Sequence, residues 1–322
     1  MEKFKWMRVL LMAAVLMGLY KYQASRFDQA EQILGDKPFK NELSPITQNE
    51  KENIIKSEPL KNHQAVKLKE QKTEPITIKS TPVETTSTIG PPKVKPGHVL
   101  FEVKMNNWVV TQGDILLGQL KEQNSIKVGQ YKPNNPKLWP TSTIPYFVAD
   151  DYPYVQLIED VINYFNENTP IRFRAPKQGD KDGIVFRSGE EHCYSYLGRV
   201  GGFQPIFLGE ECRGPQIIHE ILHALGFVHE QSRTDRDEYV EILWDEIQPD
   251  FHLQFMQVPD SFMMVNKHTQ FDYNSVMLYQ PTAFAKSPGQ IVMKSKTEED
   301  ISPTMDGLSE GDLQKLNQVY GR

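Results

Sequence analysis

Twelve residues near the middle of the chain combine three histidines with two acids at a spacing that can hold a metal ion. Residues 219–230 read HEILHALGFVHE. His219 and His223 are four residues apart, so a helix would place their rings on one face, about one turn apart. Zinc accepts neutral imidazole nitrogens, and two rings placed in this way can reach the same ion. The pattern therefore predicts a zinc site.

The residues around these two histidines indicate a catalytic zinc. Glu220 is rotated away from the histidine face, which favours contact with a zinc-bound water over contact with the metal. Gly226 is expected to end the helix, because glycine enters left-handed backbone at little cost, and the turn lets His229 supply a third ligand. Three ligands leave a fourth position to water. A bare H-E-x-x-H also occurs on ordinary amphipathic helices with packed histidines, but Gly226 and His229 at these offsets favour zinc.

The motif needs helices and strands to position it. Proline is favoured in the first turn of a helix, so the zinc helix is expected to begin near Gly214–Pro215. A second helix is expected over Tyr154–Asn166, where apolar residues recur at mostly helical spacing. Strands are expected at Ile144–Val148, Ile171–Phe173 and Ile184–Phe186. Strands that alternate with helices predict a mixed sheet with a helix on one face.

Two residues after the zinc motif are further candidates. Met277 is the only well-placed candidate for the methionine turn that follows the zinc helix in metzincins, and its thioether would pack beneath the ligands. An ordinary core methionine is compatible with the same position. Tyr279 could offer its phenol to a substrate oxyanion, and the alternative is a core tyrosine bonded to backbone.

The two cysteines of the chain, Cys193 and Cys212, enclose a glycine-rich stretch. In an exported protein we expect them to form a disulfide. The alternative is a pair of reduced thiols near the metal, where the thiolates would compete for zinc. The compartment of the protein therefore decides between the two interpretations.

The N-terminus has the pattern of an export signal. Three basic residues lie among the first eight, and Val9–Tyr20 is a largely apolar run of twelve residues. That run is short for a membrane span, which takes roughly 20 residues, and suits a signal peptide over residues 1–25. A cleavage site after Ala24 is poor because Tyr22 is large. An uncleaved N-terminal anchor through residues 9–20, with the protein facing outside, is the alternative.

Charge and composition divide the chain. Residues 1–97 carry 16 Lys and Arg against 11 Asp and Glu, whereas residues 98–322 carry 20 against 31. The acidic second part argues against nucleic acid as a partner, because phosphate binding needs a basic face. Residues 26–97 are rich in Lys, Glu, Thr and Pro and predict a disordered tether. Short strands are expected from His98 onwards, at Val99–Val103 and Trp108–Val110.

From Trp139 to Tyr320 the sequence resembles the astacin family of zinc endopeptidases. After the third histidine, residues 230–236 read EQSRTDR, which is similar to the extended signature of that family. Residues 275–279, SVMLY, resemble its methionine turn. Leu308 and Ser309, with the following Asp312, Asn317 and Tyr320, are similar to its C-terminal helix.

The resemblance implies an α+β fold with two subdomains. One carries a mixed, twisted sheet and two long helices, the second being the zinc helix, and the other carries the methionine turn with Met277. Substrate would lie extended between them and pair with an edge strand. Tyr279 would move to stabilise the transition state, and Glu230 would bind near the new N-terminus after activation.

The resemblance also implies a role for Asp114. By itself Gly113-Asp114 is only a turn signal. Astacin propeptides carry a Phe-x-Gly-Asp element whose aspartate occupies the open zinc position and silences the zymogen. Residues 111–114 read TQGD, which is similar except that Thr111 replaces the phenylalanine. We therefore expect a propeptide at residues 98–130 and a peptidase domain at residues 131–322.

These features predict a secreted zinc endopeptidase made as a zymogen, with one Zn²⁺ per subunit. Glu220 would act as general base toward a zinc-activated water. The expected partners are protein or peptide substrates, and we expect a monomer. A catalytically inactive, zinc-stabilised binding or adhesion module is the alternative, and Glu220 argues against it. A metalloenzyme acting on another bond is excluded only by the family resemblance.

Overall fold

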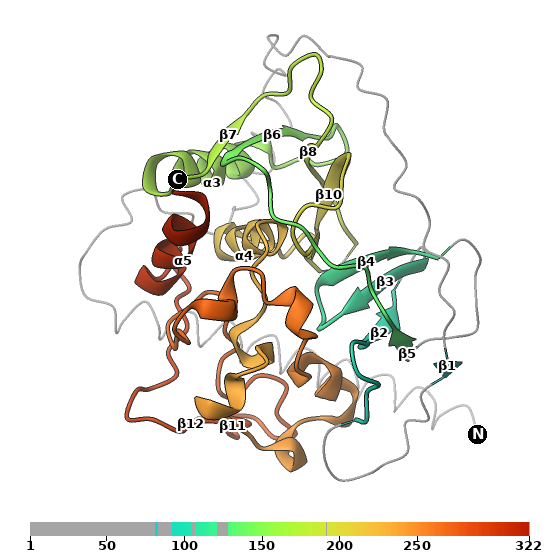
Figure 1. Cartoon of the computed structure of the whole chain (residues 1–322), viewed down its shortest axis with the longest axis vertical. Coiled ribbons are helices and arrows are strands. Elements are labelled where there is room, and N and C mark those ends of the chain that lie inside the picture. The colour runs from blue at the N-terminus through green and yellow to red at the C-terminus, as the bar shows by residue number, and fades with distance from the viewer. Residues whose placement is uncertain (1–80, 83–91, 105–106, 121–127, 191, 322) are drawn as a thin grey trace, which may run out of the picture. The chain divides into compact units, whose positions relative to one another are not determined.

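The architecture is that of a computed structural model, which describes residues 81–82, 92–104, 107–120, 128–190 and 192–321 (Figure 1). All of these residues belong to one compact unit, residues 55–322. The expected signal or anchor at residues 1–25 lies outside the described residues, as does most of the expected tether at 26–97. A mixed sheet with helices is present, so the predicted α+β fold is confirmed.

The strands of the described residues form one large sheet and one small one. The ten-stranded sheet has the order β1-β5-β2-β3-β4-β9-β10-β8-β6-β7, and β11 pairs with β12. The strands are β1 (Thr81–Pro82), β2 (Val99–Val103), β3 (Trp108–Thr111), β4 (Ile115–Gln119), β5 (Val128–Tyr131), β6 (Thr143–Val148), β7 (Arg172–Arg174), β8 (Gly183–Ser188), β9 (Tyr194–Tyr196), β10 (Phe203–Leu208), β11 (Val240–Ile242) and β12 (Met293–Ser295).

The large sheet joins two parts of the sequence. Strands β6, β7, β8 and β10 pair in parallel, and β9 is antiparallel to β10. Strands β2, β3 and β4 form an antiparallel meander, and β5 pairs with β2 at its outer side; these strands are drawn in teal and green in Figure 1. The meander continues the sheet because β4 pairs in parallel with β9, with Ile115 opposite Ser195 and Leu116 opposite Tyr196. The segment expected to be a propeptide therefore adds strands to the sheet of the peptidase part.

In the part of the chain that the structure describes, three α-helices accompany the sheet, α3 (Val155–Asn168), α4 (Gly214–Ala224) and α5 (Glu310–Tyr320). The apolar side chains of α3, such as Phe165, pack in one core with the sheet and with the buried face of α4. Tyr320 of α5 joins the same core. Short 3₁₀ helices dominate the part between α4 and α5: η2 (Glu230–Ser232), η3 (Arg236–Glu238), η4 (Trp244–Glu246), η5 (Pro249–Phe255), η6 (Asp260–Phe262) and η7 (Asn266–His268).

The elements expected from the sequence occur close to their expected bounds. The helix expected over Tyr154–Asn166 is α3, and the zinc helix α4 begins at Gly214 as proline placement predicted. The expected disulfide is formed between Cys193 and Cys212. Strands β1, β4, β5, β9, β10, β11 and β12 were not expected. Strand β9 has only three residues and β10 contains Pro205, so neither gives a clear local strand signal.

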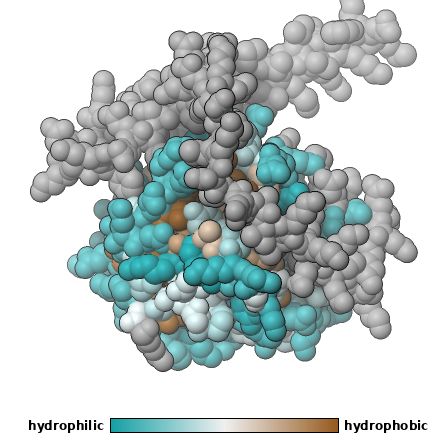
Figure 2. Space-filling view, turned by 90° about the horizontal axis from the view of Figure 1, so that it is seen from above, coloured by the Kyte–Doolittle hydropathy of each residue, from teal (hydrophilic) through white to brown (hydrophobic). Residues whose placement is uncertain are grey.

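The described surface is mostly polar. Figure 2 shows largely hydrophilic residues on the visible face, with small groups of hydrophobic ones between them. Scattered apolar residues of this kind are ordinary on protein surfaces. Among the described residues, no helix combines the length and the apolarity of a membrane span.

Candidate metal centre

Two histidines project from the same side of α4. A backbone carbonyl holds the Nδ1 of each ring: Val276 O at 2.9 Å for His219 and Phe227 O at 2.8 Å for His223. Because a carbonyl oxygen only accepts, each Nδ1 carries the proton and each Nε2 keeps its lone pair in the neutral ring. Both Nε2 atoms are therefore available to a metal ion.

The turn at Gly226 brings the third histidine to the same place. Gly226 has φ of +103°, and a Cβ added there would lie 3.0 Å from Leu138 and 3.1 Å from Met264. Its N–H donates to the carbonyl of His223, which closes the end of α4. Only glycine fits this position without strain and collision, so the chain reverses and His229 lies buried beside the first two rings.

Side chains from distant elements also anchor the end of α4. The Trp139 indole donates to Ala224 O at 2.8 Å, and the Tyr320 hydroxyl donates to Leu225 O at 2.7 Å. These carbonyls have no partner within the helix. The bonds therefore fix the end of the helix immediately before the turn to His229.

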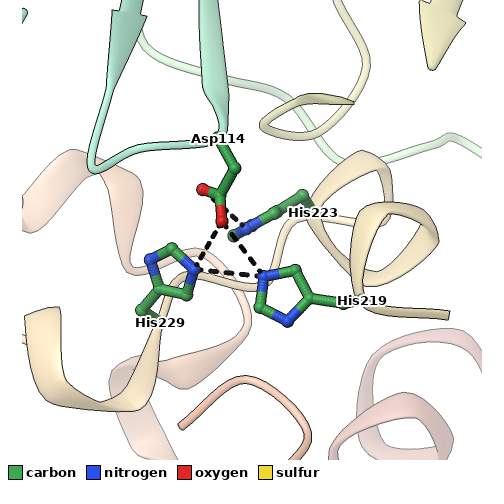
Figure 3. Close-up of side chains that lie close together, drawn as sticks. All are labelled: Asp114, His219, His223 and His229. Carbon is green, nitrogen blue, oxygen red and sulfur yellow. Dashed lines mark hydrogen bonds and ion pairs between the residues drawn. The ribbon is translucent and has the colours of Figure 1, made fainter. Parts of the chain in front are cut away.

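Asp114 completes a cluster with the three histidines (Figure 3). One carboxylate oxygen lies 3.1 Å from His229 Nε2 and 3.4 Å from His219 Nε2, and the other lies 3.4 Å from His223 Nε2. All four potential ligand atoms lie within 4.8 Å of one another. Asp114 lies in the turn before β4, more than a hundred residues from the histidines in sequence.

The chemistry of the cluster fits a zinc ion. His223 Nε2 and Asp114 Oδ1 are buried and have no hydrogen-bond partner among the described residues. Leaving such atoms unpaired is costly, and a cation between them removes that cost. Three imidazole nitrogens and one carboxylate oxygen are ligands of the kind that tetrahedral zinc prefers.

Protonation states favour the same conclusion. Burial lowers the pKa of His223 to about 4, so its ring is neutral at neutral pH. Burial acts to raise the pKa of Asp114, but the nearby rings of His229, His223 and His219 hold it well below its usual value. The cluster thus offers a neutral ring and a carboxylate, the forms that bind a metal.

Glu220 lies beside the cluster and outside it. Its side chain is buried, and Oε2 has no hydrogen-bond partner among the described residues. Burial raises the pKa of Glu220 well above its usual value, and the negative charge of Asp114 adds to the shift. A carboxylate with a raised pKa in a buried site is suited to accept and return a proton.

Tyr279 is held by residues of the preceding segment and of η5. Its hydroxyl lies 3.1 Å from the carbonyl oxygen of Gln112 and 3.2 Å from Gln254 Oε1. Its ring lies against His229, with ring centroids 4.9 Å apart. Gln112 also donates from Nε2 to Met256 O at 2.6 Å. No local motif singles out Gln112 as a partner of Tyr279, because the contact spans 167 residues.

Glu230 is the centre of a buried polar network. Its carboxylate accepts from Lys315 Nζ at 2.6 Å, Asn266 Nδ2 at 2.9 Å and Arg233 Nη1 at 3.0 Å, and from the backbone N–H of Asp272 at 3.2 Å. Four donors already surround this carboxylate without a free N-terminus. Lys315 and Asn266 were not expected from the sequence, because they lie 85 and 36 residues from Glu230.

Met277 is a fully buried side chain of the main core, and it follows Val276, whose carbonyl accepts from His219. Its carbonyl accepts from the Glu230 N–H at 3.0 Å, and its own N–H donates to Ser275 Oγ at 3.0 Å. Ser275 in turn donates to the Asp312 carboxylate at 2.6 Å. These bonds connect the loop of Met277 to the residue after His229 and to α5.

Comparison with protein families identifies the group in which this arrangement occurs. The family model Astacin (Peptidase family M12A) matches residues 131–321, more than half of the chain. The chain belongs to the astacin family. The matched range holds all three histidines and begins after Asp114, so the carboxylate reaches this cluster from outside the astacin match.

Individual astacins support the assignment. Zinc metalloproteinase nas-13 of Caenorhabditis elegans is 38% identical over 56% of this chain and 40% of its own length. The beta subunit of meprin A from Mus musculus is 37% identical over 65% of this chain and 29% of its own length. Among solved structures, high choriolytic enzyme 1, a hatching enzyme zinc-protease from Oryzias latipes, matches with a TM-score of 0.50 and 32% identity.

The extent of these matches differs. The structural match covers 58% of this chain and 99% of the choriolytic enzyme. The sequence matches span under half the length of nas-13 and of the meprin subunit. The astacin domain is therefore the shared part. The names of these relatives identify zinc enzymes, which agrees with the donor set around His219, His223 and His229.

Proposed function

We propose that this protein is a zinc-dependent endopeptidase made as an inhibited precursor. The observation that carries the proposal is the convergence of three histidine Nε2 atoms and the Asp114 carboxylate at one point, with the buried Glu220 beside them. His219, His223 and His229 would hold the zinc, and Asp114 would occupy the remaining position until the segment that carries it is removed. The family membership supports peptide bonds as the substrate.

A bound zinc ion would supply a Lewis acid that polarises the scissile carbonyl and lowers the pKa of water. Glu220 would accept the proton of the attacking water and deliver it to the leaving amine. Its raised pKa suits both steps, because the carboxylate must bind the proton long enough to return it. General acid–base help of this kind is worth about 10²–10⁴-fold in rate.

Tyr279 would donate a hydrogen bond to the developing oxyanion. Burial, followed by the charges of Asp114 and Glu220, raises the pKa of Tyr279 well above its usual value, so the phenol keeps its proton. In the structure that proton is directed at Gln112 and Gln254. Removal of the preceding segment would free the hydroxyl from Gln112 for substrate.

The inhibited precursor is supported by two contacts on one short turn. Asp114 lies at the histidines, and the carbonyl of Gln112 engages Tyr279. Strand β4 then pairs with β9, the edge where an extended substrate would bind. We infer a propeptide over residues 98–130. This segment would occupy the open metal position, the hydroxyl of Tyr279 and the strand edge for substrate at the same time.

Export of the protein is part of the proposal. A basic and then apolar N-terminus and the disulfide between Cys193 and Cys212 both suit a secreted chain. Anchoring through residues 9–20 with the peptidase outside is the second form of the same proposal. We propose that the protein acts as a monomer on protein or peptide substrates.

A cleavage assay tests the function. The zinc-loaded full-length protein is incubated with casein before and after limited proteolysis, with and without a chelator. We expect casein cleavage only after proteolysis, lost with chelator and restored by zinc. A processed protein that retains zinc and cleaves neither casein nor a mixed peptide library would instead be a binding module.

A further inference from the structure

Ile115, the residue after Asp114, fills an apolar recess beside the metal centre. Its side chain is fully buried in a cluster that is separate from the main core. Two buried members of the cluster, Val99 and Ile115, come from the meander strands β2 and β4. The other buried members belong to the peptidase part and are named here the Ile115 recess: Leu197, Val228, Val258, Phe262 and Met263.

The position of the Ile115 recess is fixed relative to the metal ligands. Val228 immediately precedes His229, and Leu197 immediately follows β9. The Ser195 N–H donates to the Asp114 carbonyl at 3.0 Å, and Ile115 is opposite Ser195 in the β4–β9 pairing. Ile115, which fills the recess, therefore lies one residue along the chain from the carboxylate that reaches the histidines.

We propose that the Ile115 recess is the specificity pocket of the processed enzyme and selects an aliphatic substrate side chain next to the scissile bond. The inference rests on the proposed function. A peptide that pairs with β9 and presents its carbonyl at the histidines places a neighbouring side chain over the recess. The buried side chains of the recess are all apolar, so an aliphatic group is favoured, whereas a charged group would be desolvated without a partner.

Cleavage-site profiling tests the pocket. Full-length protein is purified with zinc, activated by limited proteolysis and incubated with a mixed peptide library, and the cut sites are sequenced. We expect Ile, Leu or Val to be enriched at one position within two residues of the cut. Cleavage without such enrichment would overturn the pocket and leave the endopeptidase standing, whereas the absence of any cleavage would overturn the proposed function itself.

A pair of matched variants assigns the preference to these residues. Val258→Ala enlarges the recess, whereas Val292→Ala makes the same change in a separate apolar cluster around β11 and β12. We expect Val258→Ala to raise the ratio of kcat/KM for a Phe peptide over a Val peptide by about tenfold, since a few methylenes in a pocket change rates by that order. Val292→Ala should leave the ratio unchanged.

Phe262→Leu also enlarges the Ile115 recess, and it is the second variant to use if Val258→Ala does not fold. It should shift the same ratio in the same direction at the same substrate position. An equal ratio in the wild-type protein and in each folded recess variant would overturn the assignment of the pocket.

Discussion

At the scale of single residues, the three histidines are held in different ways. Carbonyl oxygens behind His219 and His223 fix their rings, whereas Nδ1 of His229 is buried without a partner among the described residues. His229 is positioned instead by the backbone bond from Glu230 to Met277 and by the ring of Tyr279. The third ligand therefore depends on distant residues more than the first two do.

Glu220→Gln tests the general base. The amide keeps the size of the side chain but cannot accept the proton, so we expect kcat of the processed enzyme to fall by about 10²–10⁴-fold. Zinc content and thermal unfolding should stay as in the wild-type protein, because Glu220 is not among the clustered ligand atoms. Near-full activity of a zinc-loaded variant would remove Glu220 from the mechanism.

Asp114→Ala tests the inhibitory contact. Without the carboxylate, the unprocessed protein should hydrolyse a short peptide at least tenfold faster than the unprocessed wild type, because the fourth position opens to water. Asp180→Ala is the control, since Asp180 pairs with Arg174 and is not part of the metal cluster. If the Asp114 variant is as silent as the wild type, covering of the substrate edge by β4 is sufficient for inhibition.

At the scale of elements, the site depends on how α4 ends and on what lies behind it. The turn at Gly226 brings His229 to the cluster, and Lys315 of α5 donates to the carboxylate of the next residue, Glu230. Helix α5 thus supports the metal centre through this ion pair, through Asp312 and through Tyr320, although none of its residues is among the clustered ligand atoms. Two different substitutions test the turn and the ion pair separately.

Gly226→Ala tests the turn. Backbone strain at positive φ costs about 1–3 kcal/mol, and the new Cβ would also press on Leu138 and Met264. Gly179→Ala is a matched control, because Gly179 has φ of +97° with nothing within 4 Å of the added Cβ. We expect both variants to unfold at lower temperature, but only Gly226→Ala to lose zinc affinity in a chelator competition. Equal zinc affinity would show that the turn tolerates the methyl group.

Lys315→Met tests the ion pair with Glu230. Both side chains are buried, and breaking such a pair costs about 3–5 kcal/mol because a charge is left in the interior. Lys267→Met breaks an exposed pair with Asp260 and should cost under about 1 kcal/mol. Urea unfolding of the zinc-loaded proteins measures the loss of unfolding free energy in both variants. Similar costs for the two variants would mean that Glu230 is satisfied by its other donors.

At the scale of the whole molecule, local signals in the sequence predicted those features that depend on residues close together in the chain. The start of α4, its end at Gly226 and the histidine spacing each follow from residues a few positions apart. Lys315 lies 85 residues from Glu230, and Gln112 lies 167 residues from Tyr279. No periodicity or motif encodes such contacts, because they arise only when the sheet and α5 are assembled.

The pH dependence of the metal-free protein is a property of the whole fold. The folded-state pKa of His223, about 4 because of burial, lies below the unfolded value of about 6.5. The native state therefore binds fewer protons, so its stability is retained above about pH 6.5 and falls as the pH drops toward 4. Asp114, with its lowered pKa, changes stability in the same direction as the pH falls.

Urea unfolding of the metal-free protein at pH 7, 5.5 and 4.5 measures this dependence. The raised pKa of Glu220 changes stability in the opposite direction as the pH falls, so the contribution of His223 is measured as a difference between two proteins. We expect the free energy of unfolding of the wild-type protein to fall relative to that of His223→Gln at each step to lower pH, because the variant lacks the titrating ring. An equal slope in the two proteins would contradict a buried neutral His223.

The pairing of β4 with β9 has a consequence for solubility. While the meander is in place, the peptidase sheet does not end at β9. Loss of the meander would leave the N–H and C=O groups of β9 unpaired, together with the apolar residues that β4 covers. Exposed edges of this kind promote self-association. We therefore expect the precursor to be the form that tolerates high concentration, and the activated enzyme to be kept soluble best when a peptide occupies its edge.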